Sequence, residues 1–346
     1  MSPAPLLSVE ELRVGFATEA GLLQAVDGVS FEVEPGEVVA IVGESGSGKT
    51  VTALTIMGLT RGENSRIEGS VTLDGVELSA ASEEEIRRLR GDRIAMVFQE
   101  PMTSFNPVYR LGSQIVEAIR AHRPEISKGQ GRERVVELFE AVGIPDPERR
   151  VDDYPHEFSG GMRQRAMIAM ALALEPELLI ADEPTTALDV TIQAQILDLL
   201  RDLNAQRNLA TILITHDLGV VAEAADRVLV MYAGKVVEQG TLEEIFYDPQ
   251  HPYTWGLLGS LTRLDRPRPK RLPQIPGSPP SPGELPEGCP FRPRCPHEFS
   301  KCRQYPSLEA RLPDAPSHCD RCWLSPEEKR EKREVDGQIG LEATSS

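Results

Sequence analysis

The chain has 346 residues, of which 40% are hydrophobic and 26% charged, a composition typical of a soluble globular protein of roughly two domains. Asp and Glu number 54 against 37 Lys and Arg, so the formal net charge is −17. This surplus repels phosphate backbones and disfavours an extended nucleic-acid groove. No apolar run approaches the ~18 residues of a spanning helix, and the first residues are acidic where a signal peptide is basic. We therefore expect a cytosolic chain.

The first quarter of the chain alternates strand patterns with turn residues. Residues 7–16 and 22–37 have the pattern of strands with turns, and the apolar run 38–43 has that of a buried strand. Apolar residues at helical spacing predict a helix over 49–59, and 69–75 return to a strand pattern. This quarter is therefore a strand, glycine-rich loop and helix unit.

The middle of the chain is first helical and then alternates between strand and helix. Apolar residues three and four apart predict a helical insertion over about 100–175. Strand patterns at 178–182, 210–215 and 227–234 then enclose a helix over 191–206. This alternation predicts an α/β fold with a mostly parallel sheet, preceded by an antiparallel β subdomain and interrupted by the helical insertion.

The last quarter of the chain changes composition. Residues 266–288 form a proline-rich connector that cannot sustain a helix or a central strand, and a small cysteine-bearing unit follows it. We therefore divide the chain into a nucleotide-binding domain over 1–260, a cysteine-containing C-terminal region over 261–325, and a tail. The tail, 326–346, has too little apolar content to pack, so we expect it to be disordered.

The sequence GESGSGKT fits the eight-position phosphate loop, and it lies between a strand and a helix as that motif requires. Backbone N–H groups of such a loop wrap the phosphates, and the helix N-terminus adds its dipole. Lys49 would neutralise phosphate charge, and the Thr50 hydroxyl would ligate Mg²⁺. A chance glycine-rich turn is the alternative, which the flanking strand and helix disfavour. The predicted phosphate-binding residues are Gly43, Glu44, Ser45, Gly46, Ser47, Gly48, Lys49 and Thr50.

Two further segments suggest parts of a hydrolytic site. The apolar run LLIA leads into Asp182, which would hold Mg²⁺, and Glu183, which could take a proton from the water attacking the γ-phosphate. Taken alone, an Asp-Glu pair after an apolar strand more often marks a strand end that turns into solvent. A phosphate loop in the same chain favours the hydrolytic interpretation instead. Ser159, Gly160 and Gly161 precede a helix and could present N–H groups to an anion, although an ordinary N-cap explains the same pattern.

The chain resembles the ATP-binding subunits of ABC transporters over residues ~7–260. The resemblance rests on GESGSGKT, VFQEP, SGGMRQR, LLIADEP, ALD and ITHD, which occur in this order. It implies that Gln99 senses the γ-phosphate and its Mg²⁺, and that His216 contacts the γ-phosphate. It also implies that Asp189 communicates across a dimer and that Phe16 stacks on adenine.

In this family two subunits sandwich two ATP molecules head to tail. Ser159, Gly160 and Gly161 would then serve the partner's nucleotide, and hydrolysis would reopen a dimer that ATP and Mg²⁺ had closed. Met162 replaces the Gln of the commonest signature, but the backbone donors do not depend on that side chain. We expect the permeases to dock near residues 99–109.

A narrower resemblance is to the D-type ATPase subunits of oligopeptide, dipeptide and nickel importers, on the stretches HPYTWGLL, QEPMTSFNP and CPFRPRCP. It implies a homologous F-type ATPase partner, two membrane permeases and an extracytoplasmic substrate-binding protein, with this chain at the cytoplasmic face of the cell membrane. Peptide is the expected substrate by family frequency alone, with nickel or another small solute as the alternative. A soluble ABC-type ATPase acting on nucleic acid or ribosomes would need a second cassette or a long insertion, with basic surface. A nonenzymatic metal-binding regulator would leave the hydrolytic residues without a role.

All five cysteines lie between residues 289 and 322. In a reducing cytosol such a cluster more often binds metal or reacts in redox chemistry than forms disulfides. Four thiolates suit a [4Fe–4S] cluster, and the spacing differs from the paired C-x₂-C of many zinc sites. Zn²⁺, with His297 or His318 as substitute ligands, and unligated redox thiols are the alternatives. Cys322 is preferred to Cys319 because its neighbour Trp323 matches the resembling pattern; the expected ligands are Cys289, Cys295, Cys302 and Cys322.

Overall fold

The computed structural model describes residues 4–19, 21–99, 104–186, 188–260, 275–281 and 283–335. Residues 100–103, the connector up to 274 and the tail beyond 335 lie outside the described residues. None of the described helices is both long and apolar enough to cross a bilayer.

The main sheet has eight strands in the order β11-β12-β10-β9-β3-β8-β7-β6 within the described residues. Five neighbouring strands run parallel, and every residue of four of them, β3, β6, β7 and β8, is buried, as expected for a sheet covered on both faces. The parallel strands are β9 (Arg227–Tyr232), β3 (Val38–Val42), β8 (Ala210–Thr215), β7 (Leu178–Asp182) and β6 (Ile94–Val97).

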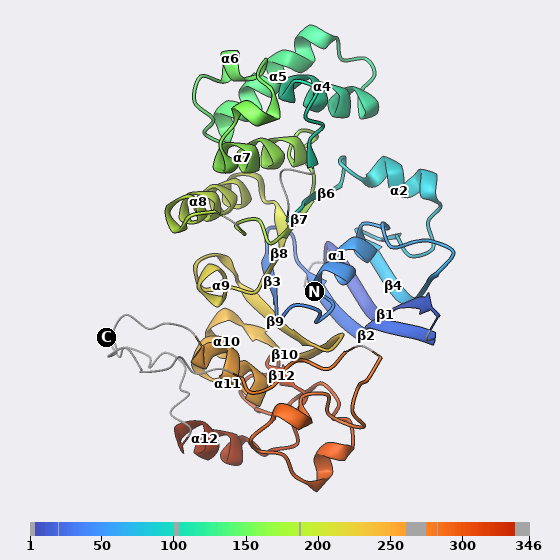
Figure 1. Ribbon diagram of the computed structural model, residues 1–346, viewed down its shortest axis with the longest axis vertical. Coiled ribbons are helices and arrows are strands. Elements are labelled where there is room, and N and C mark those ends of the chain that lie inside the picture. Colours follow the sequence, from blue (N-terminus) through green and yellow to red (C-terminus); the bar gives the residue numbers. More distant parts are fainter. Residues whose placement is uncertain are drawn as a thin grey trace.

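Successive residues of β3 enter different cores on the two faces of this sheet. Val39 and Ile41 pack in the core that includes α1, whereas Ala40 and Val42 pack in the core beneath α9, α10 and α11. Figure 1 shows α8, α9, α10 and α11 along one side of the main sheet and α1 on the other. The helices are α1 (Lys49–Ile56), α8 (Val190–Arg207), α9 (Leu218–Ala224), α10 (Leu242–Tyr247) and α11 (Pro252–Gly259).

A second, antiparallel sheet has the strand order β2-β1-β4-β5. Its buried face packs into the same core as α1. A short helix, α2 (Glu83–Leu89), follows it and begins at a capping box formed by Ser82 and Glu85. The strands are β1 (Leu7–Thr18), β2 (Gly21–Val33), β4 (Ser65–Leu73) and β5 (Val76–Glu77).

The helical insertion packs into a core that it shares with β6, β7 and α8. In this core Phe139 and Phe158 meet edge to face with ring centroids 6.1 Å apart. The insertion lies at one end of the molecule, beyond β6 and β7 (Figure 1). The predicted α/β fold, with a mostly parallel sheet, antiparallel β subdomain and helical insertion, is therefore confirmed. The insertion's helices are α4 (Leu111–His122), α5 (Lys128–Ala141), α6 (Pro147–Arg150), η1 (Pro155–Glu157) and α7 (Gly160–Ala171).

The cysteine-bearing region extends the main sheet. The strand β12 (Cys319–Asp320) pairs antiparallel with β10 (Lys235–Thr241), and β11 (Glu309–Ala310) pairs with β12. Two single turns of 3₁₀ helix, η2 (Arg292–Arg294) and η3 (Ser300–Arg303), carry part of the cysteine segment. Phe291, just before η2, packs in the core of the nucleotide-binding part, so the two regions share a hydrophobic core.

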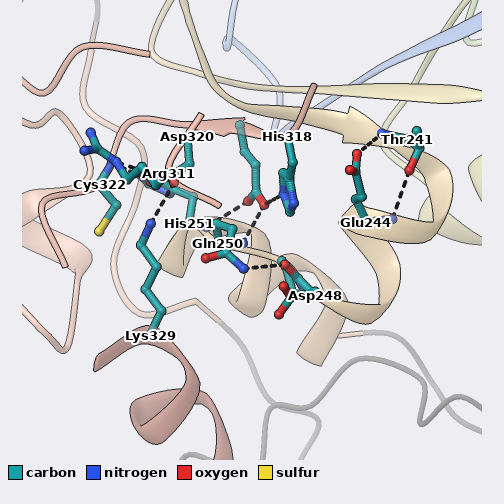
Figure 2. Close-up of polar contacts among 12 residues, drawn as sticks. Thr241, Glu244, Asp248, Gln250, His251, Arg311, His318, Asp320, Cys322 and Lys329 are labelled. Atoms are coloured by element: carbon teal, nitrogen blue, oxygen red, sulfur yellow. Dashed lines mark hydrogen bonds and ion pairs between the residues drawn. The ribbon is translucent and has the colours of Figure 1, made fainter. Parts of the chain in front are cut away.

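A buried carboxylate joins β10, the segment before α11 and the residue before β12. Glu238 is fully buried, and it accepts hydrogen bonds from the backbone N–H groups of Gln250 at 2.5 Å and His251 at 2.9 Å. His318 Nε2 lies 2.8 Å from the same carboxylate. Burial opposes the charge on Glu238, but His318 outweighs it, so the pKa of Glu238 is lowered. Figure 2 shows Gln250, His251 and His318 close to one another around this carboxylate, which is drawn without a label.

The structure contradicts the prediction that the tail is disordered, at least for residues 326–335, which form the helix α12 (Pro326–Val335). Lys329 Nζ lies 2.7 Å from Asp320 Oδ2, and both side chains are 1% exposed (Figure 2). Arg333 donates to Asp248 and to the carbonyl of Pro249. The prediction was wrong because it considered only apolar content, whereas this helix docks through the buried pair of Lys329 with Asp320 and the partly exposed pair of Arg333 with Asp248.

We expect Lys329→Met to lower the free energy of unfolding of the C-terminal part by about 3 kcal/mol, because the buried Asp320 carboxylate would lose its closest partner and keep only Arg311, whose Nε is 3.6 Å away. Adding Asp320→Asn should recover much of the loss. Urea unfolding followed by tryptophan fluorescence measures the effect, since both tryptophans, Trp255 and Trp323, lie in this part. Arg330→Met, at an exposed position of the same helix, is the control; equal stability of the two variants would contradict the prediction.

Candidate functional site

The predicted hydrolytic residues lie around one cavity because three parallel strands end at the same edge of the sheet. The phosphate loop follows β3, Asp182 and Glu183 lie at the end of β7, and His216 follows β8. The cavity has a volume of about 790 Å³, and its lining includes Gly43, Glu44, Ser45, Gln99, Glu183 and His216. Residues far apart in the sequence thus share one solvent-accessible space.

Two glycines allow the phosphate loop to pass close to other backbone. Gly43 has a φ of 152°, and a Cβ there would lie 2.2 Å from the carbonyl oxygen of Met231. Gly48, which caps α1, has a φ of 100°, and its Cβ would lie 2.6 Å from the carbonyl oxygen of Ala25. No side chain caps the N-terminus of α1, so its N–H groups are available to an anion.

Lys49 is held inside the loop. It is 6% exposed, and its Nζ donates to the carbonyl oxygens of Gly43 at 2.7 Å and Glu44 at 3.0 Å. Burial lowers the pKa of Lys49, and the nearby Glu183 carboxylate opposes that shift. The ammonium group is therefore aligned along the loop that is predicted to cradle the phosphates.

Thr50 and Asp182 form a pair of oxygen ligands that suits Mg²⁺. The Thr50 hydroxyl donates to Asp182 Oδ1 at 3.4 Å, from the first turn of α1 to the end of β7. Asp182 is buried, and this burial raises its pKa above the ordinary value. A hydroxyl and a carboxylate are hard oxygen donors, and a divalent cation there would favour the ionised carboxylate.

Glu183 is held by three side chains. Its carboxylate accepts hydrogen bonds from Gln99 Nε2 at 2.9 Å and from the Thr186 hydroxyl at 2.8 Å, and His216 Nδ1 lies 3.0 Å away. Burial works to raise the pKa of Glu183, but Thr186 and His216 outweigh it, so the pKa is lowered. The carboxylate is therefore ionised at neutral pH and can accept a proton. The sequence analysis missed Thr186, which the turn after Glu183 brings back to the carboxylate.

The signature residues lie at the start of α7, outside the cavity lining. Ser159 caps this helix and accepts a hydrogen bond from the Met162 N–H at 3.3 Å. Asp189 caps α8 in the same way, accepting from the Ile192 N–H at 3.0 Å. Among the described residues, no side chain accepts a hydrogen bond from the other N–H groups at these two helix starts. The proposed roles of Ser159 and Asp189 across a dimer stay predictions.

Phe16 lies on β1, where it is partly buried against the core shared with α1. It is not among the residues that line the cavity. Its stacking on adenine stays a prediction.

Comparisons with known proteins match this arrangement. Residues 26–186 match the family described as ABC transporter, and residues 237–302 match the family described as oligopeptide/dipeptide transporter, C-terminal region. The Bacillus subtilis dipeptide transport ATP-binding protein DppD is 52% identical over 92% of this chain and 94% of that protein. The Salmonella typhimurium oligopeptide transport ATP-binding protein OppD is 52% identical over 89% of this chain and 91% of its own length.

The chain belongs to the ATP-binding subunits of ABC transporters, in their oligopeptide and dipeptide branch. A solved relative, the ATP-binding cassette MJ0796 in a dimeric post-hydrolysis state bound to ADP and Pi, superimposes with a TM-score of 0.62 at 27% identity. The structural match covers 68% of this chain and 98% of the MJ0796 chain. The cassette is thus shared, and the remaining part of this ABC subunit includes the cysteine region.

Four of the five cysteines of this ABC subunit line a common narrow cavity of about 20 Å³. Burial raises the pKa of Cys289 to about 11 and that of Cys322 to about 12. Cys319 is not in the lining, and its thiol faces Gln239. Among the described residues, no group of three or more His, Cys, Asp and Glu side chains is arranged to hold a metal ion. The lining cysteines are Cys289, Cys295, Cys302 and Cys322.

Two residues far along the chain reach the phosphate loop, Tyr253 on α11 and Arg294 in the cysteine-bearing region, and the sequence analysis missed both contacts. The Tyr253 hydroxyl accepts a hydrogen bond from the Glu44 N–H at 2.8 Å, and Arg294 pairs with the Glu44 carboxylate. They lie 209 and 250 residues from Glu44 in the sequence, so no local pattern could reveal them.

We expect Gly161→Ala to destabilise the protein by about 1–3 kcal/mol, because a Cβ at Gly161 would lie 2.7 Å from Cγ2 of Ile192 on α8. Gly160→Ala is the matched control, since its Cβ would meet nothing closer than 3.8 Å. The control should be neutral or slightly stabilising. Thermal unfolding of both variants measures the difference. A Gly161→Ala variant as stable as the control would contradict the prediction, because it would show that Ile192 on α8 can move aside at no cost in stability.

Proposed function

We propose that this chain powers peptide import by an ABC transporter, as one half of a nucleotide-sandwich dimer whose closure is passed to membrane permeases. The observation that carries the proposal is the Glu183 carboxylate, ionised and held by three side chains at the cavity that the phosphate loop lines. Peptide follows from the relatives, whose names state dipeptide and oligopeptide transport. Nickel or another small solute is the alternative substrate.

In the proposed mechanism each residue has one task. Lys49 and the loop N–H groups hold the β- and γ-phosphates, while Thr50 and Asp182 hold Mg²⁺, which offsets phosphate charge. Glu183 takes a proton from the water whose oxygen attacks the γ-phosphorus, as the bond between that phosphorus and ADP breaks. Gln99 and His216 position the Glu183 carboxylate through the contacts they make with it. In this proposal both residues also contact the γ-phosphate.

The partners are assigned by family. A homologous F-type ATPase would supply the second half of the dimer, and the N-terminus of α7, with Ser159, Gly160 and Gly161, would bind the partner's nucleotide. Asp189 would lie at the same interface. Two permeases would dock near residues 99–109, an extracytoplasmic protein would deliver the substrate, and nucleic acid has no part. The chain would act at the cytoplasmic face of the cell membrane.

Copurification tests this assignment. The tagged chain, expressed with the products of neighbouring genes, should bring down two permeases and a second ATPase, and peptide with its binding protein should stimulate ATP hydrolysis. Stimulation by nickel and not by peptide would favour the alternative substrate. An active ATPase that assembles with ribosomes or nucleic acid and with no permease would overturn the proposal.

We expect Lys49→Ala to weaken ATP binding, because Lys49 offsets phosphate charge in the ground state. Glu183→Gln should preserve binding and slow hydrolysis by about 10²–10⁴, the usual contribution of one general base. Nucleotide affinity of the chain and turnover of the assembled transporter separate the two effects. Normal turnover in Glu183→Gln would remove the general-base role from this residue.

We further propose that Cys289, Cys295, Cys302 and Cys322 bind a [4Fe–4S] cluster. The support is the donor chemistry: four thiols surround one cavity, and four thiolates are the ligand set of such a cluster. The cavity is narrow and has about the space of one water molecule. The four thiols therefore match the cluster as ligands, but the cavity does not match its size. When bound, the cluster would supply four iron–thiolate bonds that cross-link the C-terminal region. Zn²⁺ is the alternative metal.

We expect Cys322→Ser to lose the metal and Cys319→Ser to keep it, while both variants still bind ATP. Iron and sulfide analysis after anaerobic purification, with a visible spectrum near ~400 nm, measures the cluster. Stoichiometric zinc without iron would contradict the cluster, and equal iron in both variants would contradict the choice of the fourth ligand.

A further inference from the structure

A carboxylate of the phosphate loop is paired with an arginine of the cysteine-bearing region. Arg294 Nη1 donates to Glu44 Oε2 at 2.5 Å, and Nη2 donates to Oε1 at 3.0 Å. The Arg294 side chain is 5% exposed and that of Glu44 29%. Two parallel N–H···O bonds of this kind need a planar guanidinium, which lysine cannot replace.

The remaining donors of Arg294 fix the guanidinium from the other side. Nε donates to the carbonyl oxygen of Pro276 at 2.9 Å, and Nη2 donates to those of Ile275 at 3.4 Å and Gly277 at 3.3 Å. Nη1 also donates to the Tyr232 hydroxyl at 3.3 Å. The arginine is therefore held in place by the described part of the connector and by the end of β9, and Glu44 is held in turn.

The backbone of Glu44 is fixed independently, from α11. Its N–H donates to the Tyr253 hydroxyl, and the Tyr253 ring packs against Tyr232 with centroids 4.6 Å apart. The start of α11 is itself anchored, because the His251 N–H donates to the buried Glu238 carboxylate (Figure 2). Tyr253 thus holds the main chain of Glu44 and Arg294 holds its side chain, and both come from segments that follow the cassette motifs in the sequence.

Glu44 lies in the wall of the cavity that receives the nucleotide, and Arg294 lies in the same wall. A free carboxylate there would repel the phosphates of ATP, since like charges a few ångströms apart interact strongly in a partly buried site. The arginine removes this repulsion and keeps the carboxylate turned toward the C-terminal region. Its charge therefore matters for ATP binding even without a direct contact to the nucleotide.

We propose that Arg294 is a positioning residue of the ATP site, which neutralises Glu44 and holds the phosphate loop in its binding conformation. The cysteine-bearing region is then part of the nucleotide site. The inference rests on the ATP-binding activity of the family and not on the peptide substrate, the permeases or the iron–sulfur cluster.

The test is MgATP affinity of the full-length chain, measured with a fluorescent ATP analogue and competition by ATP. Arg294→Ala should raise the dissociation constant roughly tenfold, which corresponds to about 1.4 kcal/mol. The double variant Arg294→Ala/Glu44→Gln should return most of the lost affinity, because the unpaired charge is gone. The control is Arg303→Ala, an exposed arginine of the same region that does not line the cavity, and it should bind as the parent chain does.

Rescue separates positioning from a merely structural role. If Arg294 served only to hold the carbonyls of 275–277, Glu44→Gln would rescue nothing, and that outcome overturns the proposal. Unchanged affinity in Arg294→Ala overturns it as well. Should Arg294→Ala fail to fold, Arg294→Gln keeps an amide donor for the carbonyls, and the same loss and the same rescue are required of it.

Discussion

The parallel pairing of β3, β8 and β7 is the constraint on which the site depends. Val42 pairs with Thr215, and Asp182 pairs with Ile214, so the three strands end level with one another. Whatever follows each strand therefore emerges at one edge of the sheet, where it can meet a single ligand. The interior of these strands is buried on both faces, so a shift of register would remove apolar residues from two cores at once.

Glu183, at this edge of the sheet, has a strained backbone conformation that fixes the direction of its carboxylate. Its φ of 48° is in the left-handed region, which is costly for a residue with a side chain. The Glu183 N–H donates to the carbonyl oxygen of Ile214 at 2.8 Å, which continues the pairing of β7 with β8 past the strand end. That bond, together with the three side chains around the carboxylate, over-determines the strained conformation, so the carboxylate is aimed before a nucleotide arrives.

Much of the site could be predicted from the sequence because its parts are local. A glycine-rich loop between a strand and a helix, or acidic residues after a buried strand, are patterns of adjacent residues, and the parallel sheet then gathers them without further information. The same reasoning failed for residues 326–335, because composition counts apolar surface and does not count a buried ion pair such as that of Lys329 with Asp320. The contact of Thr186 with Glu183 is local, because a single turn brings the two residues together, but no motif in the sequence names it.

The contacts of Glu44 could not be predicted, and the motif itself explains why. The phosphate loop specifies glycines, a lysine and a hydroxyl residue, but it leaves the position of Glu44 open. A carboxylate at an open position next to bound phosphates is unfavourable unless another part of the chain neutralises it. Among the described residues that line the cavity, those of the cassette include no arginine. Arg294 neutralises Glu44 from a segment that the cassette motifs do not include. Glu44, which the motif does not constrain, therefore connects the C-terminal region to the ATP site. Through this contact, a change in the C-terminal region can alter the affinity of the site for ATP.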